Sequence, residues 1–128
     1  MPDTNTSISK GARIAGWILT ILPCLLFAMS AAMKFIQPAG FDEGLKHMGW
    51  DAATMKYIGI VELACAAIYL FPRTAVLGAI LLTGYMGGAI ATHVRVGDMV
   101  FTQILIGIVI WFALWLRDSR VKNLIPLN

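Results

Sequence analysis

The sequence predicts an all-α integral membrane protein, a four-helix up-down-up-down bundle with a short interfacial helix between the first and second spans. Hydrophobic residues make up 59% of the 128 residues and charged residues only 13%, whereas an average soluble domain carries about 25% charged residues. Four apolar segments, 14–33, 57–72, 74–94 and 99–116, contain a single charged residue, Glu62. Short links between these segments place consecutive helices antiparallel.

The same composition excludes several classes of protein. A disordered chain or an ordinary soluble enzyme carries more charge than this sequence does. The formal net charge is +3, but no basic run is present, so we expect no nucleic-acid partner. We expect the cations to flank the spans at the lipid headgroups instead. Cys24 and Cys65 form no ligand motif, which predicts small apolar fillers and no metal site.

The N-terminal part is predicted to hold a tail, one span and an interfacial segment. Residues 1–11 are polar and small, which predicts a flexible tail. We interpret 12–33 as the first span; the alternative is a signal peptide, but the apolar stretch exceeds the ~7–15 residues of such a core. Within 35–50, Phe41 and Leu45 recur at helical spacing opposite charged residues, which favours a short helix lying flat at the interface. An irregular loop is the alternative there.

Three further spans complete a single predicted domain over 12–120. Asp51 is a typical N-cap residue and predicts that the second span follows over 52–71. The third and fourth spans are expected over 74–94 and 99–116.

Sidedness follows from the distribution of Lys and Arg. The side that holds both termini carries six of the ten Lys and Arg residues. The positive-inside rule therefore predicts both termini in the cytoplasm, in a bacterial cytoplasmic membrane, with 121–128 as a short cytoplasmic tail. Arg117, Arg120 and Lys122 are expected to be anchors at this inner surface.

Glu62 is the residue that most needs an explanation. It lies ten residues after Ala52, about 15 Å into the second span at 1.5 Å per residue. An ionised carboxylate at that depth costs at least a few kcal/mol, so it is expected to face the bundle interior, to find partners or to stay protonated.

Other polar residues are expected to gather on the outer side of Glu62. Helical spacing brings them to similar levels of the antiparallel bundle. The predicted ligand-binding pocket consists of Glu62, Lys34, Tyr85, His93, Arg95 and Gln103. Small residues that permit close helix approach are Gly59, Gly84, Gly88 and Gly107. The alternatives are purely structural roles: headgroup anchoring for the cations, packing for Tyr85 and a hydrogen bond between helices for Gln103.

The arrangement of these residues resembles the DoxX-like membrane proteins over roughly 12–120. The likeness is carried by Lys34 in AMKF, Glu62 in GIVELA, a Gly-rich third span that ends at His93 in GYMGGAIATHVRVGD, and the closing WLRDSR. The family is named after a small subunit associated with a thiosulfate:quinone oxidoreductase, and some relatives look like partners or assembly factors. The resemblance therefore implies a fold rather than a reaction, and it implies no assigned catalytic role for Glu62 or His93.

Three functions are compatible with these residues. The first is a non-catalytic partner or assembly protein, not an enzyme on its own, which packs against a second copy or another membrane protein in the lipid bilayer. The alternative is a subunit of a membrane oxidoreductase complex that binds a quinone or small lipophile and has no cofactor of its own. A small-solute transporter is the third, although four helices would need to oligomerise and no inverted repeat is visible.

Overall fold

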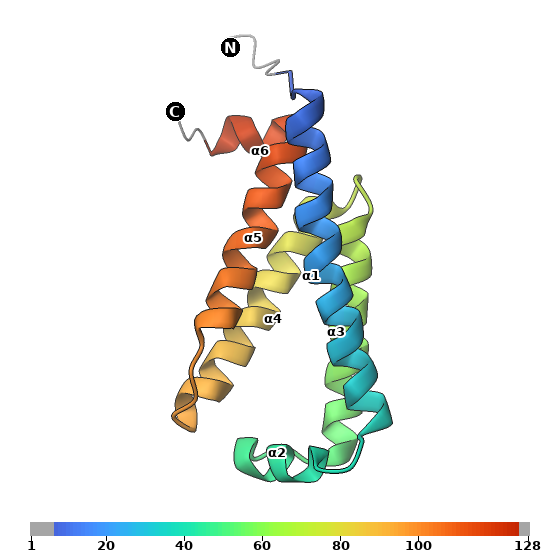
Figure 1. Ribbon diagram of the computed structural model, residues 1–128, viewed down its shortest axis with the longest axis vertical. Coiled ribbons are helices and arrows are strands. Elements are labelled where there is room, and N and C mark those ends of the chain that lie inside the picture. Colours follow the sequence, from blue (N-terminus) through green and yellow to red (C-terminus); the bar gives the residue numbers. More distant parts are fainter. Residues whose placement is uncertain (1–6, 126–128) are drawn as a thin grey trace.

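A computed structural model describes residues 7–125, in which every regular element is a helix (Figure 1). Helices α1, α3 and α4 are each long and apolar enough to cross a membrane, and α5 is a shorter apolar helix. The predicted all-α class and its four apolar helices are therefore confirmed, together with the short helix between the first two spans. The helices are α1 (Lys10–Ile36), α2 (Phe41–Met48), α3 (Ala52–Leu70), α4 (Ala75–Arg95), α5 (Phe101–Arg117) and α6 (Ser119–Leu124).

Helix α1 extends beyond both ends of the span expected at 12–33. It begins where the Ser9 side chain accepts a hydrogen bond from the Ala12 N–H, a capping contact that satisfies one free donor. It ends at Gln37, whose left-handed backbone lets its N–H bond to the Met33 carbonyl. Residues 10 and 11 of the expected tail are thus helical, and residues 1–6 lie outside the described part of the chain.

The four long helices form a ring in which each packs against two neighbours. Helix α1 packs against α3 and α5, and α4 completes the ring by packing against both of these helices. Two glycines permit the closest approaches. A Cβ on Gly16 of α1 would lie 2.8 Å from the Ala113 carbonyl oxygen of α5, and one on Gly78 of α4 would lie 2.3 Å from the Tyr69 backbone of α3. The helix backbones meet at these points because there is no side chain to separate them.

The tightest packing lies toward the end of the bundle that holds α6. Fully buried side chains there include Tyr69, Leu82, Ile110 and Leu114. Toward the opposite end, the α1–α3 pair diverges from the α4–α5 pair, and α2 lies across that end (Figure 1). We call the α6 end the inner end and the α2 end the outer end.

The two short helices are held by buried apolar side chains. Leu45 is the buried residue of α2, which agrees with the apolar side expected for an interfacial helix. Helix α6 occupies part of the expected C-terminal tail, with Val121 buried and Asp118 accepting the Arg120 N–H at its start. Residues 126–128 of that tail lie outside the described residues.

Candidate functional site

The centre of the bundle holds an ion pair between α1 and α3. The Lys34 ammonium nitrogen lies 2.9 Å from Oε2 of Glu62, whose side chain is 2% exposed. Gly59, one turn before Glu62, permits this contact because a Cβ there would lie 3.3 Å from the Lys34 Cβ. Lys34 stands in the last turn of α1. The close approach of the two helices therefore brings the lysine to the carboxylate.

One further residue of α1 and one residue of α4 complete this polar site. Lys34 also donates to the Ser30 hydroxyl, at 2.6 Å. Tyr85 of α4 lies close enough to the Glu62 carboxyl group to interact with it electrostatically. The Tyr85 ring meets the Phe27 ring edge to face, with centroids 6.4 Å apart, so its position is held by an aromatic contact to α1. Three helices thus meet at Glu62.

The ion pair with Lys34 explains how an apolar membrane helix can carry the charged residue Glu62. An isolated charge at the middle of a span costs several kcal/mol, and an opposite charge at hydrogen-bond distance offsets much of that cost. The Lys34–Glu62 pair carries no net charge and receives a further polar contact from Tyr85. The site can therefore exist inside the bundle as an internal ion pair.

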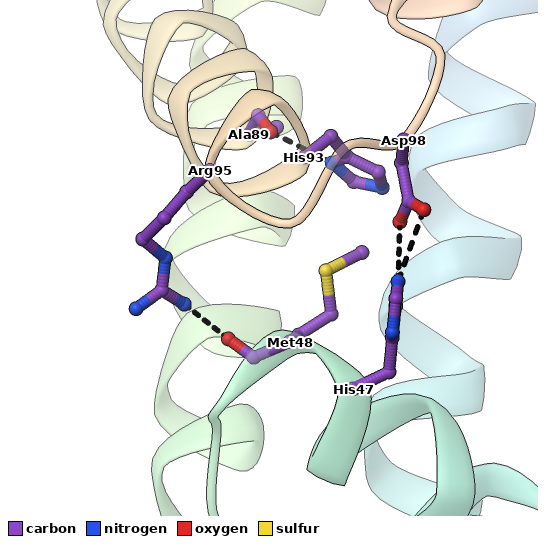
Figure 2. Close-up of polar contacts among 6 residues, drawn as sticks. All are labelled: His47, Met48, Ala89, His93, Arg95 and Asp98. Carbon is purple, nitrogen blue, oxygen red and sulfur yellow. Dashed lines mark hydrogen bonds and ion pairs between the residues drawn. The ribbon is translucent and has the colours of Figure 1, made fainter.

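A second group of polar contacts ties α2 to the outer end of α4 (Figure 2). Nε2 of His47 lies 3.0 and 3.1 Å from the two carboxylate oxygens of Asp98, in the turn after α4. The Arg95 guanidinium donates to the Met48 carbonyl at the end of α2. His93 turns back on its own helix, where Nδ1 lies 2.7 Å from the Ala89 carbonyl oxygen.

The predicted pocket residues therefore occupy different places. Lys34, Glu62 and Tyr85 come together at the centre, whereas the hydrogen bonds of His93 and Arg95 lie at the outer end. The Gln103 side-chain oxygen is buried and has no hydrogen-bond partner among the described residues. Participation of these last three residues in a pocket around Glu62 stays a prediction. No group of three metal-ligating side chains occurs within residues 7–125.

The four glycines predicted to serve helix packing fall into two groups. Gly59 lies against Lys34 and its helix, so it serves packing within the bundle. A Cβ on Gly84, Gly88 or Gly107 would meet no atom within 4 Å among the described residues, so these positions face open space there. Their use in packing against another protein stays a prediction.

A polar cluster at the inner end was not expected from the sequence. Arg117, read as a surface anchor, donates from Nε to the hydroxyl of fully buried Thr20, at 2.9 Å. Its guanidinium lies over the Trp17 ring, 4.3 Å from the centroid, and near the Tyr69 ring. The Tyr69 hydroxyl donates to the Ile110 carbonyl oxygen at 2.6 Å. The one signal in the sequence was Thr20, a hydroxyl residue within an apolar span.

The fold and the site define a multi-pass helical membrane protein with an ion pair inside its bundle. The family model described as the DoxX-like family matches residues 18–116, more than half of the chain. The chain therefore belongs to the DoxX-like family, and the resemblance drawn from its residues is confirmed. No curated protein matched the chain, and no solved structure did.

Proposed function

We propose that the protein is a non-catalytic membrane protein of partner or assembly type, which acts by binding another membrane protein or a second copy of itself. The observation that carries this proposal is the internal ion pair of the central site. Glu62 is 2% exposed and is neutralised by Lys34 of its own chain. The carboxylate is thereby engaged in holding α1 and α3 together. We therefore expect the surface that binds a partner to lie on the outside of the bundle.

The face of α4 that bears Gly84 and Gly88 supports the partner role. Both glycines are exposed, and a Cβ added to either would meet no atom within 4 Å among residues 7–125. Glycines four residues apart on a membrane helix allow a second helix to approach its backbone closely. Helix α4 also bears exposed apolar side chains such as Ile80 and Leu81, which suit lipid or another apolar helix.

The proposal includes the orientation of the protein in the membrane. Helix α1 begins and α6 lies at the same end of the bundle (Figure 1). That end carries the majority of the Lys and Arg residues. By the positive-inside rule, we place it in the cytoplasm and α2 on the opposite side of a bacterial cytoplasmic membrane.

Purification from native membranes tests the partner role. Tagged protein is extracted in mild detergent, and its mass and any stoichiometric companion are measured by size-exclusion chromatography with light scattering and by mass spectrometry. We expect a dimer or a defined complex that Gly88→Leu abolishes. The matched control is Ala64→Leu, which adds a similar side chain at an exposed position of α3. A wild-type protein that is always a lone monomer would refute the proposal.

Two unsatisfied polar groups favour a second candidate, the binding of a quinone or similar lipophile. The Gln103 oxygen is a buried acceptor without a partner in the described chain. Lys34 uses two of its three N–H donors, on Ser30 and Glu62. A quinone carbonyl could accept the third, and the hydroxyl of a quinol could donate to Gln103. Electrons would come from a partner protein.

Binding of a quinone analogue to the purified protein tests this candidate. Titration should show saturable binding that Glu62→Gln weakens and that Lys56→Gln, at an exposed lysine of α3, leaves unchanged. Equal affinity in the wild type and Glu62→Gln would rule it out.

A further inference from the structure

The outer end of the bundle contains a cavity that none of the functions above uses. It is an open depression at the protein surface, about 290 Å³ in volume, and three of its five lining residues are exposed. It lies between the α2–α3 joint and the last turns of α4, and its lining residues are Gly49, Trp50, Ala91, Thr92 and Arg95. Because α2 lies across this end (Figure 1), the cavity is at the level where an apolar bundle meets the lipid headgroups.

Arg95 is held at the mouth of this cavity by the backbone of the α2–α3 joint. Its guanidinium donates to the Met48 carbonyl (Figure 2). The next residue, Gly49, has a positive φ of +79°, and a Cβ there would lie 3.3 Å from Nη2 of Arg95. The glycine thus leaves space for the guanidinium beside the chain. One donor is used for this contact, and a guanidinium has five.

The positive charge of Arg95 has no carboxylate partner within residues 7–125. Neither of the two acidic residues nearest to the cavity lining along the chain forms an ion pair with Arg95. Asp98 pairs with His47, and Asp51 accepts the Thr54 N–H at the start of α3. Arginine stays protonated in proteins, so an unneutralised cation stands at the cavity.

The other polar atoms of the lining favour a ligand that accepts hydrogen bonds. The indole N–H of Trp50 has no hydrogen-bond partner in the described part of the chain, and an indole can only donate. The Thr92 hydroxyl already donates its hydrogen to the Gly88 carbonyl oxygen. Arg95 keeps N–H donors beyond its contact with Met48, and the lining residue Trp50 carries a further one, so an oxyanion is the ligand that suits both charge and hydrogen bonding.

We propose that this cavity binds a phosphate oxyanion at the membrane surface, carried by the headgroup of an anionic lipid or by free phosphate. The Arg95 guanidinium forms the ion pair, and the Trp50 indole donates a further hydrogen bond while its ring sits at the interface. The volume is at the lower limit of the 300–1,000 Å³ typical of small-molecule pockets. It suits a headgroup rather than a whole lipophile, which separates this site from the proposed function.

Native mass spectrometry of the detergent-purified protein tests the proposal. The protein is mixed with equal amounts of phosphatidylglycerol and phosphatidylcholine that have identical acyl chains. We expect a preference for phosphatidylglycerol on the order of five-fold, the size of one Arg contact with an anionic headgroup. Arg95→Gln should abolish the preference and Arg95→Lys should retain part of it. Lys46→Gln, which removes a charge from exposed α2 outside the cavity, should leave it intact.

Competition with inorganic phosphate distinguishes the two sources of the oxyanion. Displacement of phosphatidylglycerol by millimolar phosphate assigns the site to phosphate itself, and resistance to it assigns the site to the lipid headgroup. Circular dichroism checks that each variant is folded. If Arg95→Gln does not fold, Trp50→Phe is measured in its place and should weaken phosphatidylglycerol binding. The proposal is overturned if the wild type shows no preference, if Arg95→Gln and Lys46→Gln lower it equally, or if the replacement variant binds as the wild type does.

Discussion

At the scale of single residues, the protein deals with charge by pairing it locally. Glu62 is matched by Lys34 in the centre of the bundle, and Arg117 is matched by the Thr20 hydroxyl and aromatic rings at the inner end. Outside the spans, Asp118 forms an ion pair with Arg120. Inside the bundle, a charged group receives directed hydrogen bonds because water is scarce there.

Asp118 provides a pH prediction at this scale. Its hydrogen bond with Arg120 holds the pKa of the Asp118 carboxyl below the ordinary value of 3.8. A lowered folded-state pKa stabilises α6 above pH 3.8, and this stabilisation is lost as the pH falls through the lowered pKa. Carboxyl NMR titration should show that Arg120→Gln moves the Asp118 pKa upward. The control Lys122→Gln, whose cation lies over Trp115, should change it less; equal shifts would contradict this account.

At the scale of helices, the glycines decide where two backbones touch. Gly16 and Gly78 lie at contacts between helices of the chain, whereas Gly84 and Gly88 face open space. The same residue type therefore serves internal packing at some positions and leaves an external face free at others. The difference comes from the rotation of each helix, which a Gly-x-x-x-Gly spacing does not encode.

Substitution of two glycines of α4 separates these roles. Gly78→Ala places a methyl group 2.3 Å from the Tyr69 backbone, which cannot move as a side-chain tip can. We expect it to lower the free energy of unfolding by about 2 kcal/mol, as overpacking does in other cores. The methyl group of Gly84→Ala would meet no atom within 4 Å in the described part of the chain, so this variant should be neutral or slightly stabilising. Unfolding in mixed micelles measures both, and equal losses would show that the α3–α4 contact is described wrongly.

At the scale of the whole molecule, the ring of four helices leaves an asymmetric bundle. The inner end is tightly packed around Tyr69 and Leu82, and the outer end is bridged by α2 through His47–Asp98 and Arg95–Met48 contacts. The exposed apolar surface between the two ends suits a lipid environment. The two ends thus differ in structure as well as in charge.

Cysteine labelling tests the proposed orientation. In a background with Cys24→Ala and Cys65→Ala, a single cysteine is placed by Lys46→Cys or Ser7→Cys, both at exposed positions. A membrane-impermeant maleimide applied to intact bacterial spheroplasts should label Lys46→Cys directly and Ser7→Cys only after permeabilisation. The opposite pattern would reverse the orientation that the Lys and Arg distribution predicts.

Helix positions were predictable from the sequence because the length of an apolar run reports the thickness of a bilayer. Lys34 and Glu62 were both recognised as site residues, but their direct contact was not predicted because it depends on how far α1 and α3 approach at Gly59. Arg117 was misjudged because a cation that follows an apolar span can turn outward to the headgroups or inward to the bundle. His47 and Asp98 lie far apart in the chain, so their pairing follows only from the docking of α2.

The central claim is that the Lys34–Glu62 pair is an internal contact that holds α1 to α3, and a double-mutant cycle tests it most directly. Unfolding free energies are measured in bicelles for Lys34→Met, Glu62→Met and the double variant. We expect Lys34→Met to cost about 3 kcal/mol because it leaves a buried carboxylate without a partner. Glu62→Met should cost less because Lys34, in the last turn of α1, can reach toward the interface.

The double variant should recover most of the loss, because neither charge then remains in the bundle. That result gives a coupling energy of at least about 1 kcal/mol between the two side chains. Strictly additive losses would contradict the claim, since they would mean that Lys34 and Glu62 act independently of each other.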